Sequence, residues 1–221
     1  MASVDAVAET GLVVRGGFHP AAEDGLPGGA ETVVLVGNAG PAMWDAFTAA
    51  TWPGDRKDGP NPLDDWTRGV LAPVAGALGA RVLYPFEGPP YFPFQRWALR
   101  TGGVYVSPIG PLIDPEFGLW HAYRGALAFD QRFEVPDPGS HLSPCESCAE
   151  KPCLNTCPVG AFGPREDPEA PAPYDIPACV AHISSVDGED CLGRGCLARR
   201  SCPVGRDYIY GADQARFHMQ R

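Results

Sequence analysis

The first 144 residues contain no cysteine, although the chain has eight. The sequence also has no run of lysine or arginine, and its 17 basic residues stand against 27 acidic ones, for a formal net charge of −10. This balance argues against binding to nucleic acid or to an anionic membrane surface, because both carry negative charge themselves. We therefore expect neither a nucleic-acid partner nor a membrane partner.

Long apolar runs are missing as well. No segment approaches the about 20 apolar residues that a helix needs to cross a bilayer. The N-terminus has no basic stretch followed by an apolar one, so we expect no secretory signal. These absences predict a cytoplasmic protein, whose reducing surroundings disfavour disulfides and favour metal binding by clustered thiols.

The cysteine-free part, residues 1–140, shows strand and helix signals in turn. We predict strands at 32–36 and 81–84, helices from residue 41 and over 62–78, and two strands joined around residues 114–118. In the longer helix Asn61 is placed to cap, Pro73 to kink or interrupt, and Gly79 to terminate. The pattern predicts an α+β body with an antiparallel component.

Arg124 lies in the last predicted strand of this body. On the same face of that strand stand Trp120, Ala122, Ala126 and Ala128. An unpaired charge on a mostly apolar face is costly. Two interpretations stay open: an internal carboxylate pairs with Arg124, or the guanidinium binds an anionic group of a ligand.

All eight cysteines lie in the remaining segment, residues 141–221. Their order is Cys145-x2-Cys148-x4-Cys153-x3-Cys157-Pro158, then Cys179, then Cys191-x4-Cys196-x5-Cys202-Pro203. Bacterial ferredoxins with two clusters use C-x2-C-x2-C-x3-C-P twice, and the fourth cysteine of each run binds the other cluster. Here "CPVG" ends both runs, which favours a similar crossed arrangement.

Applied to this sequence, the crossed pattern predicts two [4Fe–4S] clusters. The first would be held by Cys145, Cys148, Cys153 and Cys202. The second would be held by Cys157, Cys179, Cys191 and Cys196. The x4 and x5 gaps leave the pairing open. Two four-cysteine zinc sites are the main alternative, although such sites usually have paired C-x2-C sequences and only one is present here. Disulfides and unligated cysteines are further alternatives.

In the order and number of its cysteines, the segment from Cys145 to Gly205 resembles epoxyqueuosine reductase and, more distantly, reductive dehalogenases. Those enzymes join a cobalamin-binding, nitroreductase-like domain to a two-cluster ferredoxin module. The resemblance implies a nitroreductase-like mixed α/β body over residues 1–140 and a bacterial-ferredoxin-like domain over residues 141–221.

The body is also similar to the B12-processing family that dealkylates and decyanates cobalamin. "VLVGNAGPAMWDAF" resembles that family's strand followed by a Pro-Ala-Met helix, and "DPEFGLWHAYRG" resembles its Pro-x-Phe-Gly-x-Trp-x-x-x-Arg-Gly segment. In that family the arginine helps to bind glutathione beside the corrin. The resemblance therefore implies a cofactor-binding role for Arg124, and we extend it to Trp120 in the same segment.

These resemblances predict an iron–sulfur oxidoreductase or electron-transfer protein, in which two clusters pass electrons to a corrinoid, cobalamin, bound by the body. One alternative is a plain ferredoxin-type carrier with no second cofactor, and another has a flavin in place of the corrinoid. We expect a redox protein as partner, and a small-molecule substrate if the protein is a cobalamin-dependent reductase. No catalytic residue is assigned.

Overall fold

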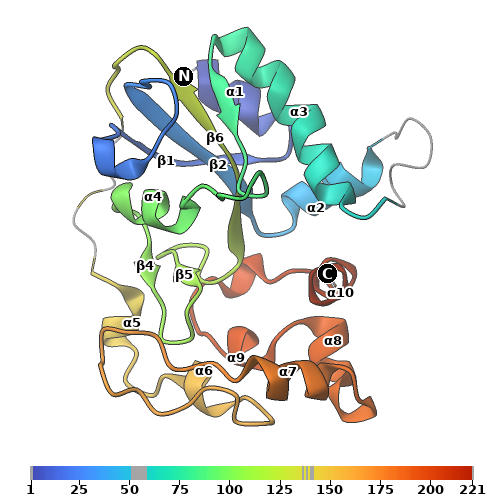
Figure 1. The fold of residues 1–221 in the computed structure, drawn as a ribbon. Coiled ribbons are helices and arrows are strands. Elements are labelled where there is room, and N and C mark those ends of the chain that lie inside the picture. Colours follow the sequence, from blue (N-terminus) through green and yellow to red (C-terminus); the bar gives the residue numbers. More distant parts are fainter. Residues whose placement is uncertain (1, 51–58, 136, 138, 140–141, 221) are drawn as a thin grey trace. The chain divides into compact units, whose positions relative to one another are not determined.

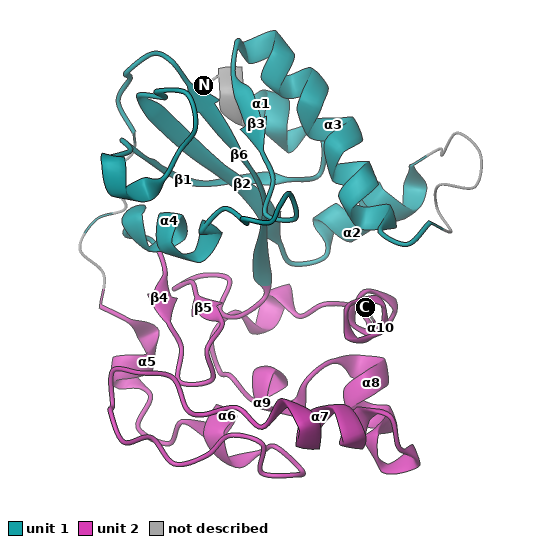
Figure 2. Ribbon diagram, viewed as in Figure 1, with its two compact units in different colours: residues 1–103, 121–140 teal, residues 104–120, 141–221 magenta. Residues whose placement is uncertain are grey.

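The computed structural model of this protein describes the whole chain except residues 1, 51–58, 136, 138, 140, 141 and 221, and the side chains of residues 2–4. The chain divides into two compact units (Figure 2). Unit 1 comprises residues 1–103 and 121–140, and unit 2 comprises residues 104–120 and 141–221. The sequence prediction assigned residues 104–120 to the body, whereas in the structure they cluster with the cysteine-rich segment.

Unit 1 is built on a four-stranded antiparallel sheet with the strand order β1-β2-β6-β3 (Figure 1). The strands are β1 Val13–Phe18, β2 Thr32–Ala39, β3 Arg81–Leu83 and β6 His121–Phe129. The helices are α1 Ala2–Ala8, the 3-10 helix η1 Ala22–Asp24, α2 Ala42–Ala49, α3 Pro62–Leu78 and α4 Phe94–Arg100. Among these helices, α1 and α4 contact β1, α2 contacts β2, and α3 contacts β3 and β6.

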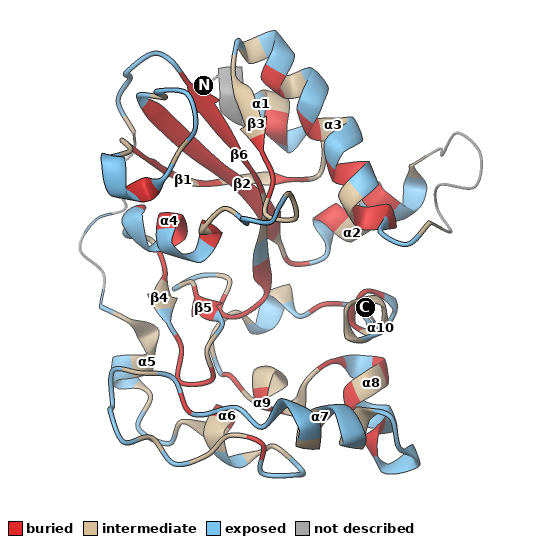
Figure 3. Ribbon diagram, in the orientation of Figure 1, coloured by how far each residue is buried: buried red, intermediate tan, exposed pale blue. Residues whose placement is uncertain are grey.

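The central strands carry the core of unit 1 (Figure 3). All of β2 except its last residue is buried, and β6 is buried over its final five residues. A continuous apolar run is what a strand with both faces covered requires, and "TVVLV" at 32–36 is such a run. The predicted strand at this position is confirmed, and β2 extends it to Ala39.

Three of the predictions from the sequence concern the start, the interior and the end of helix α3. Gly79 adopts the left-handed conformation (φ 66°) and ends the helix, as predicted. Asn61 occupies the predicted N-cap position, but its side chain makes no capping hydrogen bond. Of the two effects predicted for Pro73, an interruption is absent, because α3 continues through it, and a kink stays a prediction. Proline removes one backbone hydrogen bond, here to the carbonyl of Gly69. Both residues are exposed, so water can satisfy that carbonyl.

Unit 2 consists mainly of short helices joined by turns. Its elements are β4 Tyr105–Val106, β5 Leu112–Ile113, α5 Pro144–Ser147, α6 Pro152–Asn155, α7 Ile176–Ile183, η3 Val186–Gly188, α8 Glu189–Arg194, α9 Leu197–Arg200, η4 Arg206–Tyr208 and α10 Ala212–Met219. Buried Ile109, Ile113 and Leu119 form one core cluster with Cys153 and Cys202. Residues 104–120 thus supply the apolar side chains on which the cysteine-bearing segments pack.

The α+β class predicted from the sequence is confirmed, since an antiparallel sheet with helices is followed by a helical cysteine-rich segment. Among the residues that the structure describes, no helix is long and apolar enough to cross a membrane.

Candidate metal centres

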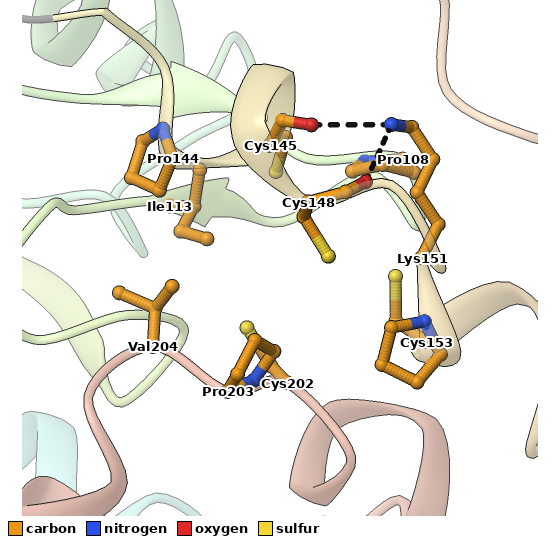
Figure 4. Close-up of a pocket in the computed structure, with 11 residues that line it drawn as sticks. Pro108, Ile113, Pro144, Cys145, Cys148, Lys151, Cys153, Cys202, Pro203 and Val204 are labelled. Carbon is orange, nitrogen blue, oxygen red and sulfur yellow. Dashed lines mark hydrogen bonds between the residues drawn. The ribbon is translucent and has the colours of Figure 1, made fainter.

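The eight cysteines are all free thiols, all belong to unit 2, and line two cavities. The first cysteine cavity is lined by Cys145, Cys148, Cys153 and Cys202 (Figure 4). The second cysteine cavity is lined by Cys157, Cys179, Cys191 and Cys196. These are the two sets that the crossed pattern predicts, so the structure brings the right residues together. That they bind metal stays a prediction.

Short helices place the thiols of the first cavity. Cys145 lies on α5, and its N–H donates to the side chain of the N-cap residue Ser143 (3.3 Å). Cys148 directly follows α5, Cys153 lies on α6, and Cys202 follows α9. Apolar residues complete the wall, and two of them, Pro108 and Ile113, come from the segment 104–120. Nothing in the sequence near the cysteines indicates that contribution.

Lys151 closes the loop between the second and third cysteines of this cavity. It adopts a left-handed backbone conformation (φ 40°), which is uncommon for a residue with a side chain. Its ammonium group donates to the carbonyl oxygens of Cys145 (3.1 Å) and Cys148 (3.0 Å). Pro152 follows, and proline disfavours a right-handed helical conformation in the residue before it. The four residues between Cys148 and Cys153 therefore form a tight turn, which the Lys151 ammonium group holds to Cys145 and Cys148. The sequence did not predict this role of Lys151.

The second cavity is built around α7. Asp175 caps this helix by accepting from the N–H of Ala178 (2.9 Å), and the helix carries Cys179. Burial, and next the Cys179 thiol, raises the pKa of Tyr174. His182 lies in the wall of the cavity.

The repeated "CPVG" corresponds to a repeated structure. Thr156 and Ser201 directly precede the two copies, and their hydroxyl oxygens lie 3.1 Å apart. Gly160 and Gly205 end the copies, and both are left-handed (φ 60° and 72°). Helices α6 and α9, just upstream, contact each other. The two copies therefore meet as a pair, while their cysteines line different cavities.

Burial disfavours ionisation of several thiols in both cavities. Burial, and next the thiol of Cys202, raises the pKa of Cys153 from 9.0 to about 11. Burial also raises the pKa of Cys145, Cys196 and Cys202. For Cys196, hydrogen bonds from the backbone N–H groups of Arg199 and Ala198 oppose this rise. Metals bind the thiolate, so a bound cation would offset the burial of these groups.

The spacing of the ligands does not match a single metal ion. Within the described parts of the chain, no three His, Cys, Asp or Glu side chains are arranged to hold one ion. Tetrahedral zinc would bring its thiolates to about 3.8 Å from one another, given a Zn–S distance of about 2.3 Å. The four thiols of each set line a common cavity of about 20 Å³.

Arg124 pairs with an internal carboxylate in unit 1. It is the extra residue of a β-bulge in β6, opposite Val36 and Gly37 of β2. Its guanidinium donates to Asp64 (2.6 Å) and to the hydroxyl of Thr67 (3.1 Å), both on α3. The Arg124 side chain is only 14% exposed. Of the two interpretations left open by the sequence, the internal carboxylate is the one present.

This pairing predicts a structural effect of Arg124→Ala. We expect the free energy of unfolding to fall by about 2 kcal/mol, because the half-buried Asp64 carboxylate loses its partner. Arg194→Ala is the control, since its ion pair with Asp190 is exposed (69% and 50%), and we expect a change within about 0.5 kcal/mol. Urea unfolding followed by circular dichroism measures both. An Arg124→Ala protein as stable as the wild type would contradict the structural role.

Trp120 belongs to unit 2 and is 1% exposed. The guanidinium of Arg199 lies over its ring at 4.5 Å, and the ring of Tyr210 meets it edge-on at 5.3 Å. Arg199 also donates to the carbonyl oxygen of Leu119 (2.9 Å). The two residues predicted to bind a cofactor thus lie in different units and contact protein groups. Their contact with a cofactor stays a prediction.

Comparison with known proteins adds no relative. No protein-family model and no curated protein matches this sequence. The resemblances therefore rest on the cysteine pattern and on the two short segments of the body. The two cysteine cavities are the structural feature that bears on function.

Proposed function

We propose that this protein is an electron-transfer protein in which each cysteine cavity holds one [4Fe–4S] cluster. The observation that carries the proposal is the sorting of eight thiols into two sets of four, each drawn from both cysteine runs. A [4Fe–4S] cluster is held by four cysteine thiolates, so two clusters use all eight. The crossed sorting is the arrangement of two-cluster ferredoxins.

The residues around the cavities suit such a group. When bound, the cluster supplies one-electron redox chemistry, at a potential set by burial, charge and hydrogen bonds to sulfur. The N–H of Ala161 donates to the sulfur of Cys157 (3.4 Å), and the backbone N–H of Val204 lowers the pKa of Cys202 against the rise caused by burial. These groups orient the thiolates and offset negative charge in the cavities.

Two observations favour clusters over the alternatives. All eight cysteines are unpaired, which speaks against disulfides. Four-cysteine zinc sites usually have paired C-x2-C sequences, and only Cys145 and Cys148 form such a pair here. A cytoplasmic location is part of the proposal, because clustered free thiols persist in reducing compartments.

A redox protein is the partner that this function requires. Transfer of electrons to cobalamin, or to a flavin in its place, stays a prediction from the resemblance of the body. Titration of the reduced protein with cobalamin, and separately with a flavin, tests this prediction. A base-off cobalamin spectrum would support the corrinoid. If neither cobalamin nor the flavin binds, the protein is a plain electron carrier.

The clusters are tested by analysis of anaerobically purified protein. We expect a brown protein with broad absorption in the blue and about eight iron and about eight acid-labile sulfide per chain. The buried thiols of each cavity hold these ions, and denaturation should release both iron and sulfide. Colourless protein with about two zinc ions per chain would contradict the proposal.

A further inference from the structure

Helix α7 presents an apolar face to solvent directly beside the second cysteine cavity. None of the residues of α7 is buried, although the helix carries Cys179 (Figure 3). Ile176 is 57% exposed and Val180 is 51% exposed. Residues four positions apart lie on the same side of a helix, so these two side chains form one apolar stripe. In the sequence, Ile176 precedes Cys179 and Val180 follows it.

Three more exposed apolar side chains lie in the cavity wall or in segments next to α7. Val159 is near Cys157 in the sequence and lines the second cavity. Tyr174 directly precedes Asp175, the N-cap of α7, and Val186 lies in η3, which contacts α7. We call the five residues together the α7 apolar face: Val159, Tyr174, Ile176, Val180 and Val186. Grouped exposed apolar residues of this kind mark interaction sites.

The charged residues next to α7 in the sequence are acidic, although α8, which contacts α7, carries the exposed Arg194. Residues 166–187 contain no lysine or arginine. Their acidic residues are all exposed: Glu166, Asp167, Glu169, Asp175 and Asp187. An apolar centre with a charged rim is the usual composition of a protein interface. An acidic rim attracts a basic partner and repels a second copy of this acidic chain.

We propose that the α7 apolar face is the docking surface for a redox protein that has a basic rim around an exposed cofactor edge. The inference rests on the proposed function, because it takes the second cavity as the point where electrons leave. A cluster held by Cys157, Cys179, Cys191 and Cys196 would supply one-electron chemistry, and a ferric haem of the partner would accept the electron and become ferrous, with no bond or proton transferred. Cys157 and Cys179, both neighbours of the face, bring this cavity close to the docked partner.

The test uses cytochrome c, a small basic haem protein, as the probe. The full-length protein is reduced anaerobically, and the second-order rate constant for reduction of cytochrome c is measured by stopped flow at several salt concentrations. We expect Ile176→Ser/Val180→Ser to lower this rate constant about tenfold. We expect Glu169→Gln/Asp187→Asn to lower it about threefold at low salt and to flatten its salt dependence. Asp175 is left unchanged because it caps α7.

Matched controls lie near the first cavity. Leu142 is 79% exposed and just precedes Pro144, and Glu146 and Glu150 are exposed acids in the same region. Leu142→Ser and Glu146→Gln/Glu150→Gln should keep the rate constant within about twofold of the wild type. Iron and sulfide contents and circular dichroism show whether each variant is folded and loaded.

The outcomes separate the two proposals. A wild-type protein without iron and sulfide would remove the proposed function, and the docking surface with it. Fully loaded face variants that reduce cytochrome c as fast as the Leu142→Ser control would overturn the docking surface alone. Sedimentation of the wild type as a dimer that Ile176→Ser/Val180→Ser abolishes would also overturn it, because the face would then bind a second copy.

Discussion

Cys202→Ala is expected to remove the same cluster as Cys145→Ala, although the two cysteines stand at opposite ends of the pattern. Each variant should lower the iron content from about eight to about four per chain, because one iron of the first cluster loses its thiolate. Cys157→Ala should instead remove the second cluster. Iron and sulfide analysis, with electron paramagnetic resonance of the reduced proteins, distinguishes which cluster remains.

Two double variants make this prediction sharp. With the crossed sorting, Cys145→Ala/Cys202→Ala should retain about four iron, since both changes affect one cluster, whereas Cys145→Ala/Cys157→Ala should retain almost none. Each double variant is the control for the other, because both lack two thiols. The reverse result would show that each run of cysteines holds its own cluster, and the crossed arrangement would be wrong.

Gly205→Ala is expected to disrupt unit 2, whereas Gly160→Ala should have a small effect. The two glycines end the two "CPVG" copies with similar left-handed backbones (φ 72° and 60°), so an alanine costs about 1–2 kcal/mol at either position. A Cβ atom on Gly205 would also lie 2.3 Å from the backbone of Phe117, but one on Gly160 meets nothing within 4 Å. We expect Gly205→Ala to lose at least about 3 kcal/mol more than Gly160→Ala.

The comparison also tests whether residues 104–120 belong to unit 2. A Cβ atom on Gly118 would lie 2.1 Å from the carbonyl oxygen of Val204, so the two turns approach each other backbone to backbone. Gly118→Ala should therefore resemble Gly205→Ala in its urea unfolding midpoint and in its loss of iron from the first cavity. Equal effects of Gly205→Ala and Gly160→Ala would contradict this packing.

Signals that act within a few residues of the chain were predictable. The apolar run at 32–36 became part of the buried β2, and Gly79 ended α3. Such features depend on local conformation and on burial of a continuous apolar segment, and both are determined by residues that are adjacent in the sequence. Pro73 does not interrupt α3, because its exposed position allows water to replace the missing hydrogen bond.

The sequence by itself determined the chemistry of the candidate site: eight thiols, their crowding in two runs and the repeated "CPVG". The crossed pattern also predicted which four thiols share a cavity. Only the tertiary structure decided that residues 104–120 wall the first cavity and that Asp64 pairs with Arg124. The physical reason is that these decisions depend on contacts between segments far apart in the chain. Spacing limits what neighbouring residues can reach, but it does not say which distant segment packs against them.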